Sequence, residues 1–200
     1  MARDFIAAMK HRRSYYALKS KSPVSDEKII EILDQALMYV PSALNSQSTR
    51  MVLLLGENHK RLWNLTKETL RKIVPADAFQ KTEEKIDRSF ASGYGTVLFF
   101  EDIAVVEQLQ AEYPTYAQNF PNWSEQTSGM HQFAVWTMLE DVGFGVSLQH
   151  YNPLIDEAVT KEWNINPKWR LIGEMPFGIP AEKPDGKTFR PLTERLLVFK

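Results

Sequence analysis

One long segment constrains the fold more than any other. Residues 123–142, WSEQTSGMHQFAVWTMLEDV, place apolar side chains on nearly the whole circumference of the helix that their spacing predicts. A helix that is apolar on most sides has to be buried on more than one side. In a chain of 200 residues, we therefore expect this segment to be a central helix or to pack against a second subunit.

Short apolar runs are spread along the rest of the chain between helical segments. Helices are expected from Phe5, after a cap at Ser25, on both sides of Pro75 and after a cap at Asp102. Strands are predicted for RMVLLLG, TVLFFED, GFGVSLQHYNP and WRLIGEMPFG, with RLLVFK as a strand at the C-terminal end. Because the runs lack the regular spacing of βαβ units, an α+β fold is favoured over a doubly wound parallel sheet.

Composition narrows the function. Lys and Arg number 24 against 25 Asp and Glu, so no basic field favours nucleic acid. The chain has no cysteine, which excludes disulfides and thiolate chemistry and suits a cytoplasmic protein. It contains no apolar run of the roughly 20 residues that a membrane span needs. We expect a single cytoplasmic domain over residues 1–200, with neither a nucleic-acid nor a membrane partner.

Several common active sites do not fit. GYGTVL and GFGVSL lack the third glycine of a dinucleotide fingerprint and precede strands instead of following them. The histidines lack metal-ligand spacing, so no metal is expected. Three adjacent carboxylate pairs are expected to be solvated or to cap helices: Glu83–Glu84, Glu101–Asp102 and Glu140–Asp141. No catalytic acid or base is predicted.

Two basic clusters and one neutral loop remain. HRRS, residues 11–14, and DGKTFRP, residues 185–191, could bind a phosphate or could simply be solvated. The loop PSALNSQSTR, residues 41–50, is crowded with uncharged hydrogen-bonding side chains between two apolar segments. Such a loop suggests a ligand, because a connector without one would more usually carry Gly, Asp or charged residues.

Taken in order, RRS, PSALNSQSTR, GYGTVLFFED, the 122–153 segment and GKTFRPLTERLLVF resemble the FMN-dependent nitroreductase family over nearly the whole chain. The chain is most similar to its short branch, typified by fungal fatty-acid-repression-mutant proteins and bacterial copper-induced nitroreductases. The resemblance implies an α+β fold with a central antiparallel sheet flanked by helices. It also implies a homodimer that exchanges its C-terminal strands and binds FMN at the subunit interface.

The resemblance further implies the cofactor-binding residues. In the family, the basic motif contacts the phosphate, ribityl chain and pyrimidine edge of FMN, and a distal cluster contacts the phosphate. The neutral loop comes from the second subunit, and the backbone of a residue pair lies against the flavin ring. Arg12, Arg13 and Ser14 match the basic motif, and Lys187 and Arg190 match the distal cluster. The neutral loop is matched by Pro41, Ser42, Asn45 and Gln47, and the residue pair by Gln149 and His150. Tyr16 stands where many larger members have a lysine.

The activity implied is an NAD(P)H-dependent nitroreductase, with a ping-pong mechanism and a role in stress defence. NADH or NADPH would donate electrons, and a small nitroaromatic or quinone-like acceptor would receive them. Tyr94, Phe120, Trp123 and Tyr151 could line the acceptor pocket or be core residues. The alternative is a flavin-binding redox sensor with little turnover.

Overall fold

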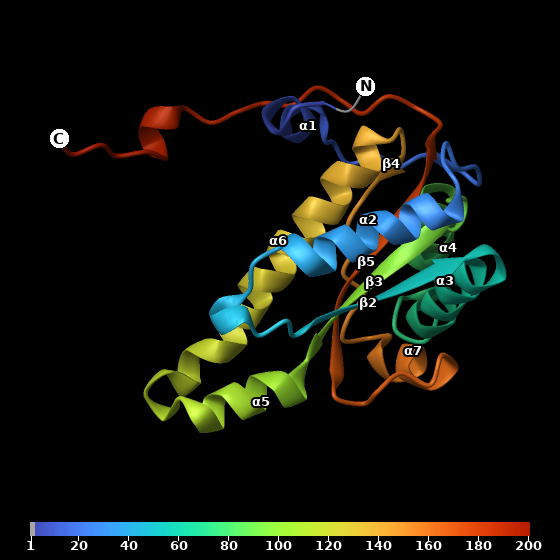
Figure 1. Ribbon diagram of the computed structural model, residues 1–200. Coiled ribbons are helices and arrows are strands. Elements are labelled where there is room, and N and C mark those ends of the chain that lie inside the picture. The colour runs from blue at the N-terminus through green and yellow to red at the C-terminus, as the bar shows by residue number, and fades with distance from the viewer. Residues whose placement is uncertain (1–2) are drawn as a thin grey trace.

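One antiparallel sheet organises the molecule, which the computed structural model describes over residues 3–200 (Figure 1). Its strand order is β1–β5–β3–β2, and β4 also pairs with β5. The strands are β1 (Leu18–Lys19), β2 (Thr49–Leu55), β3 (Gly95–Asp102), β4 (Gly145–Val146) and β5 (Trp169–Pro180). This mixture of helices with an antiparallel sheet confirms the predicted α+β class.

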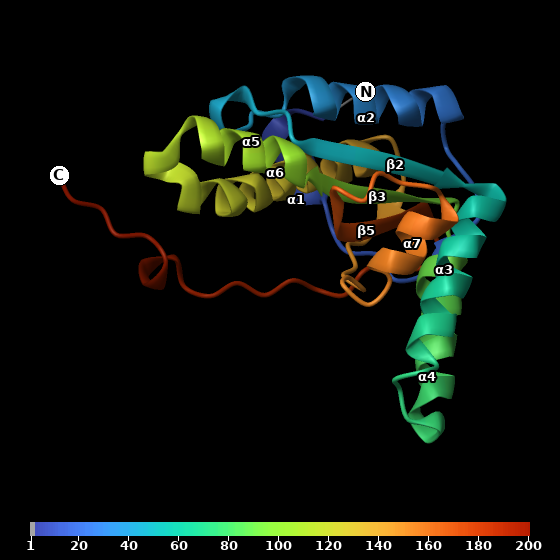
Figure 2. The same ribbon diagram turned by 90° about the horizontal axis from the view of Figure 1, so that it is seen from below.

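The alternation of side chains along β3 divides the core into two layers. Val97 and Phe99 point to one face of the sheet, whereas Leu98 and Phe100 point to the other. On the first face they pack with α2 and α6, and on the second with α3, α4 and α7. Figure 2 shows the α3–α4 hairpin projecting away from the sheet.

The helices follow the expected signals closely. Ser25 caps α2, where its side chain accepts the Lys28 N–H, and Asp102 caps α5, where it accepts the Ala104 N–H. The helices are α1 (Phe5–His11), α2 (Asp26–Tyr39), α3 (Gly56–Leu70), α4 (Ala76–Ile86), α5 (Ile103–Glu112), α6 (Phe120–Asp141) and α7 (Asp156–Glu162). A short π-helical turn over 87–91 follows α4.

Helix α6 is central, as its sequence predicts. It contacts α1, α2 and α5 as well as four strands of the sheet. Many of its buried side chains are nevertheless polar, among them Ser124, Thr127, Ser128 and His131. Helix α6 is therefore held in the core partly by hydrogen bonds of these polar side chains and not by apolar packing alone.

Two predicted strands differ in the structure. In GFGVSLQHYNP only Gly145 and Val146 form a strand, and Gln149 adds an isolated bridge to Glu174. Within residues 3–200, RLLVFK pairs with no strand and forms no regular element; both views show the C-terminal segment leading away from the sheet (Figures 1 and 2). The exchange of this segment with a second subunit stays a prediction.

Candidate functional site

The basic motif follows α1 directly and is tied to the sheet by its backbone. Asp4 caps α1 by accepting the Ala7 N–H, and the helix ends at His11. Ser14 then forms a parallel bridge with Val146, and the Tyr15 N–H donates to the Val146 carbonyl at 2.9 Å. The chain continues from Val146 toward residues 149–150. The sheet therefore places the two predicted flavin-binding stretches next to each other.

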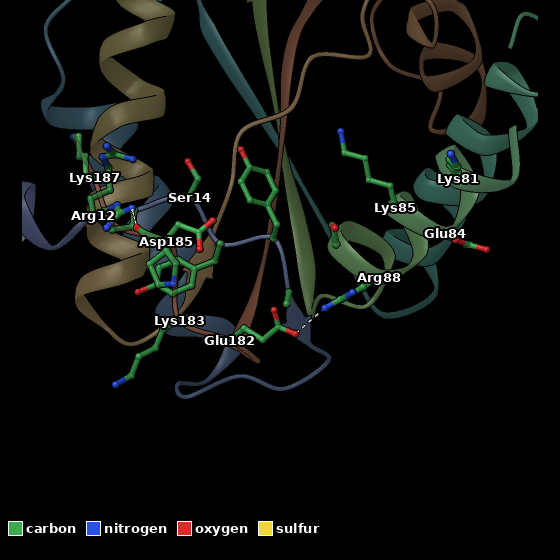
Figure 3. A pocket seen from close by; sticks show the side chains of 16 residues that line it. Arg12, Ser14, Lys81, Glu84, Lys85, Arg88, Glu182, Lys183, Asp185 and Lys187 are labelled. Carbon is green, nitrogen blue, oxygen red and sulfur yellow. Dashed lines mark hydrogen bonds and ion pairs between the residues drawn. The ribbon is translucent and has the colours of Figure 1, made fainter. Parts of the chain in front are cut away.

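A cavity of about 770 Å³ opens beside this motif. Four predicted residues line it: Arg12, Arg13, Ser14 and Lys187. Lys187 comes from the C-terminal segment, which the Arg13 guanidinium holds by donating to the Asp185 carbonyl. Figure 3 shows Arg12, Ser14 and Lys187 together on one side of the cavity. Arg190, the other residue of the distal cluster, is not among its lining residues.

The same cavity has a second side that the sequence did not indicate. Lys81, Lys85 and Arg88, from α4 and the turn that follows it, lie opposite the basic motif (Figure 3). In total the lining carries seven Lys or Arg residues and three Asp or Glu residues, although the whole chain has a net charge of −1. Such a local excess of positive charge attracts anions into the cavity.

The 149–150 pair lies against β5. Gln149 uses both backbone groups on Glu174: its N–H donates at 2.7 Å and its carbonyl accepts at 2.9 Å. Gly173 eases this approach, since an added Cβ there would lie 3.2 Å from the Gln149 oxygen and crowd it. The His150 N–H has no protein acceptor within residues 3–200, and the His150 side chain is exposed. His150 is therefore the backbone donor of this pair that remains free for a ligand.

The neutral loop lies outside this cavity. Pro41, Ser42, Asn45 and Gln47 are not among the lining residues. The Gln47 N–H donates to Ser42 Oγ at 3.0 Å, and Asn45 and Gln47 have backbone φ angles of 54° and 49°. Both amide side chains are exposed. Their proposed contact with a flavin through a second subunit stays a prediction.

Glu140 was expected to be solvated, and this was wrong. Its side chain is buried on α6, where it accepts the Arg13 N–H at 2.9 Å and the Trp136 indole N–H at 2.6 Å. The Arg12 guanidinium lies 4.4 Å from the centre of the Trp136 ring. Burial raises the pKa of Glu140 to about 7. Glu140 and Trp136 thus hold the Arg13 backbone and the Arg12 guanidinium in place.

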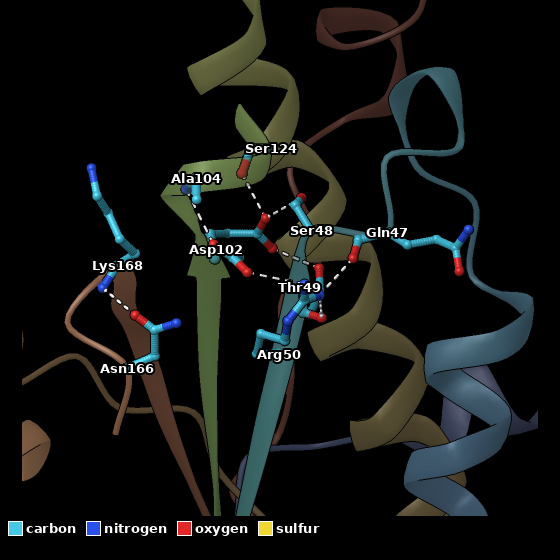
Figure 4. Close-up of polar contacts among 10 residues, drawn as sticks. Gln47, Ser48, Thr49, Arg50, Asp102, Ala104, Ser124, Asn166 and Lys168 are labelled. Carbon is cyan, nitrogen blue, oxygen red and sulfur yellow. Dashed lines mark hydrogen bonds and ion pairs between the residues drawn. The ribbon is translucent and has the colours of Figure 1, made fainter. Parts of the chain in front are cut away.

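Glu101 was also expected to be solvated and is instead fully buried at the end of β3. It accepts hydrogen bonds from the hydroxyls of Ser48, Thr49 and Ser124, each at 2.6 Å. Ser48 precedes β2 and Ser124 belongs to α6, so two separate elements hold this carboxylate (Figure 4 labels both serines). Its partner in sequence, Asp102, does cap a helix as expected. The Glu101 cluster fastens the neutral loop to the start of α6.

The four aromatic residues proposed for an acceptor pocket are dispersed. Tyr151 packs on Trp63 in the core, with ring centres 6.0 Å apart. Tyr94 donates its hydroxyl to Asp26, and Phe120 and Trp123 pack against each other at the start of α6. Within residues 3–200, the aromatic side chains that line the 770 Å³ cavity are Tyr15 and Tyr16.

Comparisons with known proteins agree on one family. The model of the nitroreductase family matches residues 9–179. The nitroreductase FRM2 of Saccharomyces cerevisiae is 33% identical over 188 residues, with 93% of each chain covered. A second protein of that yeast, HBN1, is 35% identical over 188 residues, with 92% of each covered.

Solved structures give the same result. The nitroreductase CinD from Lactococcus lactis, in complex with nicotinic acid, has a TM-score of 0.91 and 42% identity, covering 98% of this chain and 100% of that one. CinD in complex with 4-nitrophenol has a TM-score of 0.88 and 43% identity, with the same coverage. This chain therefore belongs to the nitroreductase family of oxidoreductases.

Proposed function

We propose that this chain is an FMN-dependent NAD(P)H oxidoreductase that reduces nitroaromatic or quinone-like acceptors by a ping-pong mechanism. The observation that carries the proposal is the cationic cavity in which Arg12, Arg13 and Lys187 gather beside Ser14. The backbone of Ser14 joins this cavity to the strand that leads to His150.

The residues present fit FMN. Arginine and lysine donors suit the dianionic phosphate, because charge-assisted hydrogen bonds to phosphate are the strong ones. The cavity volume of about 770 Å³ lies within the usual range for a small-molecule site. Arg12, Arg13 and Lys187 would hold the phosphate, and the free His150 N–H would donate to the flavin ring.

The chain itself supplies binding and orientation. When bound, FMN would supply the hydride chemistry that links the reduced nicotinamide to the acceptor. Glu140 and Trp136 would keep the arginines in place, so that little ordering is needed when the phosphate binds. A protein acid or base is not needed for hydride transfer, so the proposed reaction requires no catalytic dyad from this chain.

The acceptor class rests on relatives of the same family. CinD, at 42–43% identity, has been solved with 4-nitrophenol and in a further complex with chloramphenicol. Both of these molecules carry a nitroaromatic ring. We extend that acceptor class to this chain because the fold match covers 98% of it.

The test begins with the purified protein. It should be yellow, release FMN on denaturation, and lose its colour when NADH or NADPH is added without oxygen. Addition of 4-nitrophenol or a quinone should then restore the colour and support steady turnover. A colourless protein that cannot be reconstituted with FMN would overturn the proposal. Reduction without turnover on any nitro, quinone or azo acceptor would favour a redox sensor instead.

A further inference from the structure

On the side of the cavity formed by α4, the positive charges outnumber the carboxylates that could pair with them. Lys81 and Lys85 are one helical turn apart, and Arg88 follows on the same side (Figure 3). Like charges at this spacing repel each other and weaken a helix. A bound anion would remove that repulsion.

The carboxylates of the hairpin do not neutralise these lysines. Glu83 pairs with Arg71 and Asp87 with Lys67, both on the α3 side. Glu84 accepts the amide of Gln80. Within residues 3–200, neither Lys81 nor Lys85 has a carboxylate oxygen within 4.0 Å, whereas Arg88 pairs with Glu182 at 2.8 Å. Both lysines are exposed to the cavity.

FMN does not account for this second cationic side. FMN has a single phosphate, and the proposed function assigns it to Arg12, Arg13 and Lys187 across the cavity. The other molecule that must enter the site is the electron donor, a dinucleotide with a diphosphate and, in NADPH, a further 2′-phosphate. We propose that Lys81, Lys85 and Arg88 bind the phosphate groups of the nicotinamide dinucleotide, an inference that rests on the proposed function.

The charge arrangement would also let the oxidised donor leave after the reductive half-reaction, before the acceptor binds. The two lysines are exposed, so their bonds to phosphate are weakened by solvent and salt. Such contacts raise the rate of encounter more than they slow release. The opposite side, where Glu140 and Trp136 fix the arginines, is built for a resident ligand.

The decisive experiment compares donors that differ in phosphate. The double variant K81Q/K85Q of the FMN-loaded protein is compared with K72Q/K161Q, which removes the same charge from exposed positions that do not line the cavity. The KM for NADH and NADPH should rise about tenfold or more in K81Q/K85Q. The rate of flavin reduction by dihydronicotinamide riboside, which lacks phosphate, should match that of the control.

A binding measurement without turnover completes the test. Adenosine 2′,5′-bisphosphate, titrated calorimetrically, should bind about tenfold more weakly to K81Q/K85Q than to the control. Unchanged KM values, or an equal loss with the riboside, would overturn the proposal for α4. Because FMN content is measured first, a wild-type protein that retains no flavin would instead overturn the proposed function.

Discussion

At the scale of single residues, the proposed contact between Arg12 and the FMN phosphate can be tested most directly. Its guanidinium lies over Trp136 and faces the cavity. Arg12→Ala should weaken FMN binding by roughly 1.5–3 kcal/mol, the value of a hydrogen bond to a charged group. Fluorescence titration of the apoprotein with FMN measures this loss. Arg12→Lys keeps the charge but not the paired donors and should lose less. An unchanged dissociation constant for Arg12→Ala would contradict the assignment of the phosphate.

Glu174 should make the folded state sensitive to pH. It is fully buried on β5, and burial raises its pKa from 4.5 to about 8. Between these two values the folded state keeps a proton that the unfolded state has released, so the contribution of Glu174 to stability is fully present below about pH 4.5 and is lost as the pH rises through about 8. The loss is on the order of 5 kcal/mol when complete. Glu140, with its pKa near 7, acts in the same direction.

Glu174→Gln should therefore reduce the loss of stability that accompanies a rise in pH. The measurement is the free energy of unfolding in urea at several pH values from about 5 to 9, with Glu84→Gln on the exposed face of α4 as the control. The amide oxygen of glutamine can still accept the Tyr151 N–H, which Glu174 accepts at 2.9 Å. Parallel curves for wild type and Glu174→Gln would show that this carboxyl does not carry the pH dependence.

At the scale of elements, local pattern predicted most of the helices and strands, because caps and apolar runs are written in neighbouring residues. Ser25 and Asp102 cap the helices that they were expected to cap. The strand predicted from GFGVSLQHYNP is short because residues 147–150 meet β5 through separate contacts of Ser147 with Pro176 and of Gln149 with Glu174, and not through a continuous ladder. Pairing of this kind depends on a distant partner, which an apolar run alone does not reveal.

The neutral loop offers a test at the same scale. Asn45 and Gln47 have left-handed backbones and exposed amides. The variant Asn45→Gly/Gln47→Gly removes both amides, and glycine readily adopts the positive φ of these positions. The free energy of unfolding should therefore change by less than about 1 kcal/mol. FMN binding should weaken clearly more than that. If stability falls and flavin affinity does not, the loop serves the fold and not the ligand.

At the scale of the whole molecule, only some of the residues that line the cavity could be predicted from the sequence. The resemblance to the family pointed to the basic motif and the C-terminal cluster, whereas their residue types alone fitted both a phosphate site and a solvated surface. Lys81 and Lys85 could not, because charged residues on a surface helix are ordinary and only the fold brings α4 across from Arg12. Glu140 was misjudged for a related reason, since Trp136 lies one turn away on the same helix but the Arg13 N–H reaches this carboxylate only in the folded chain.

The C-terminal segment gives the last prediction. Leu196, Leu197, Val198 and Phe199 are all largely exposed, and Phe199 reaches 90%. A row of apolar residues outside the core indicates an interaction surface, and an extended segment can pair with a sheet edge of a second copy. We therefore expect a homodimer, with a mass in solution of twice 23.1 kDa by light scattering.

Removal of residues 195–200 should convert this dimer into a monomer and lower its FMN content, because the neutral loop would no longer reach the cavity of a partner. Phe199→Asp, which keeps the chain length, should weaken the dimer in the same direction by placing a charge in the contact. Light scattering over a range of concentrations and the absorbance of bound flavin measure the two effects together. A truncated chain that stays dimeric and fully yellow would mean that the dimer forms through another surface, such as the exposed apolar residues of α1 and α2.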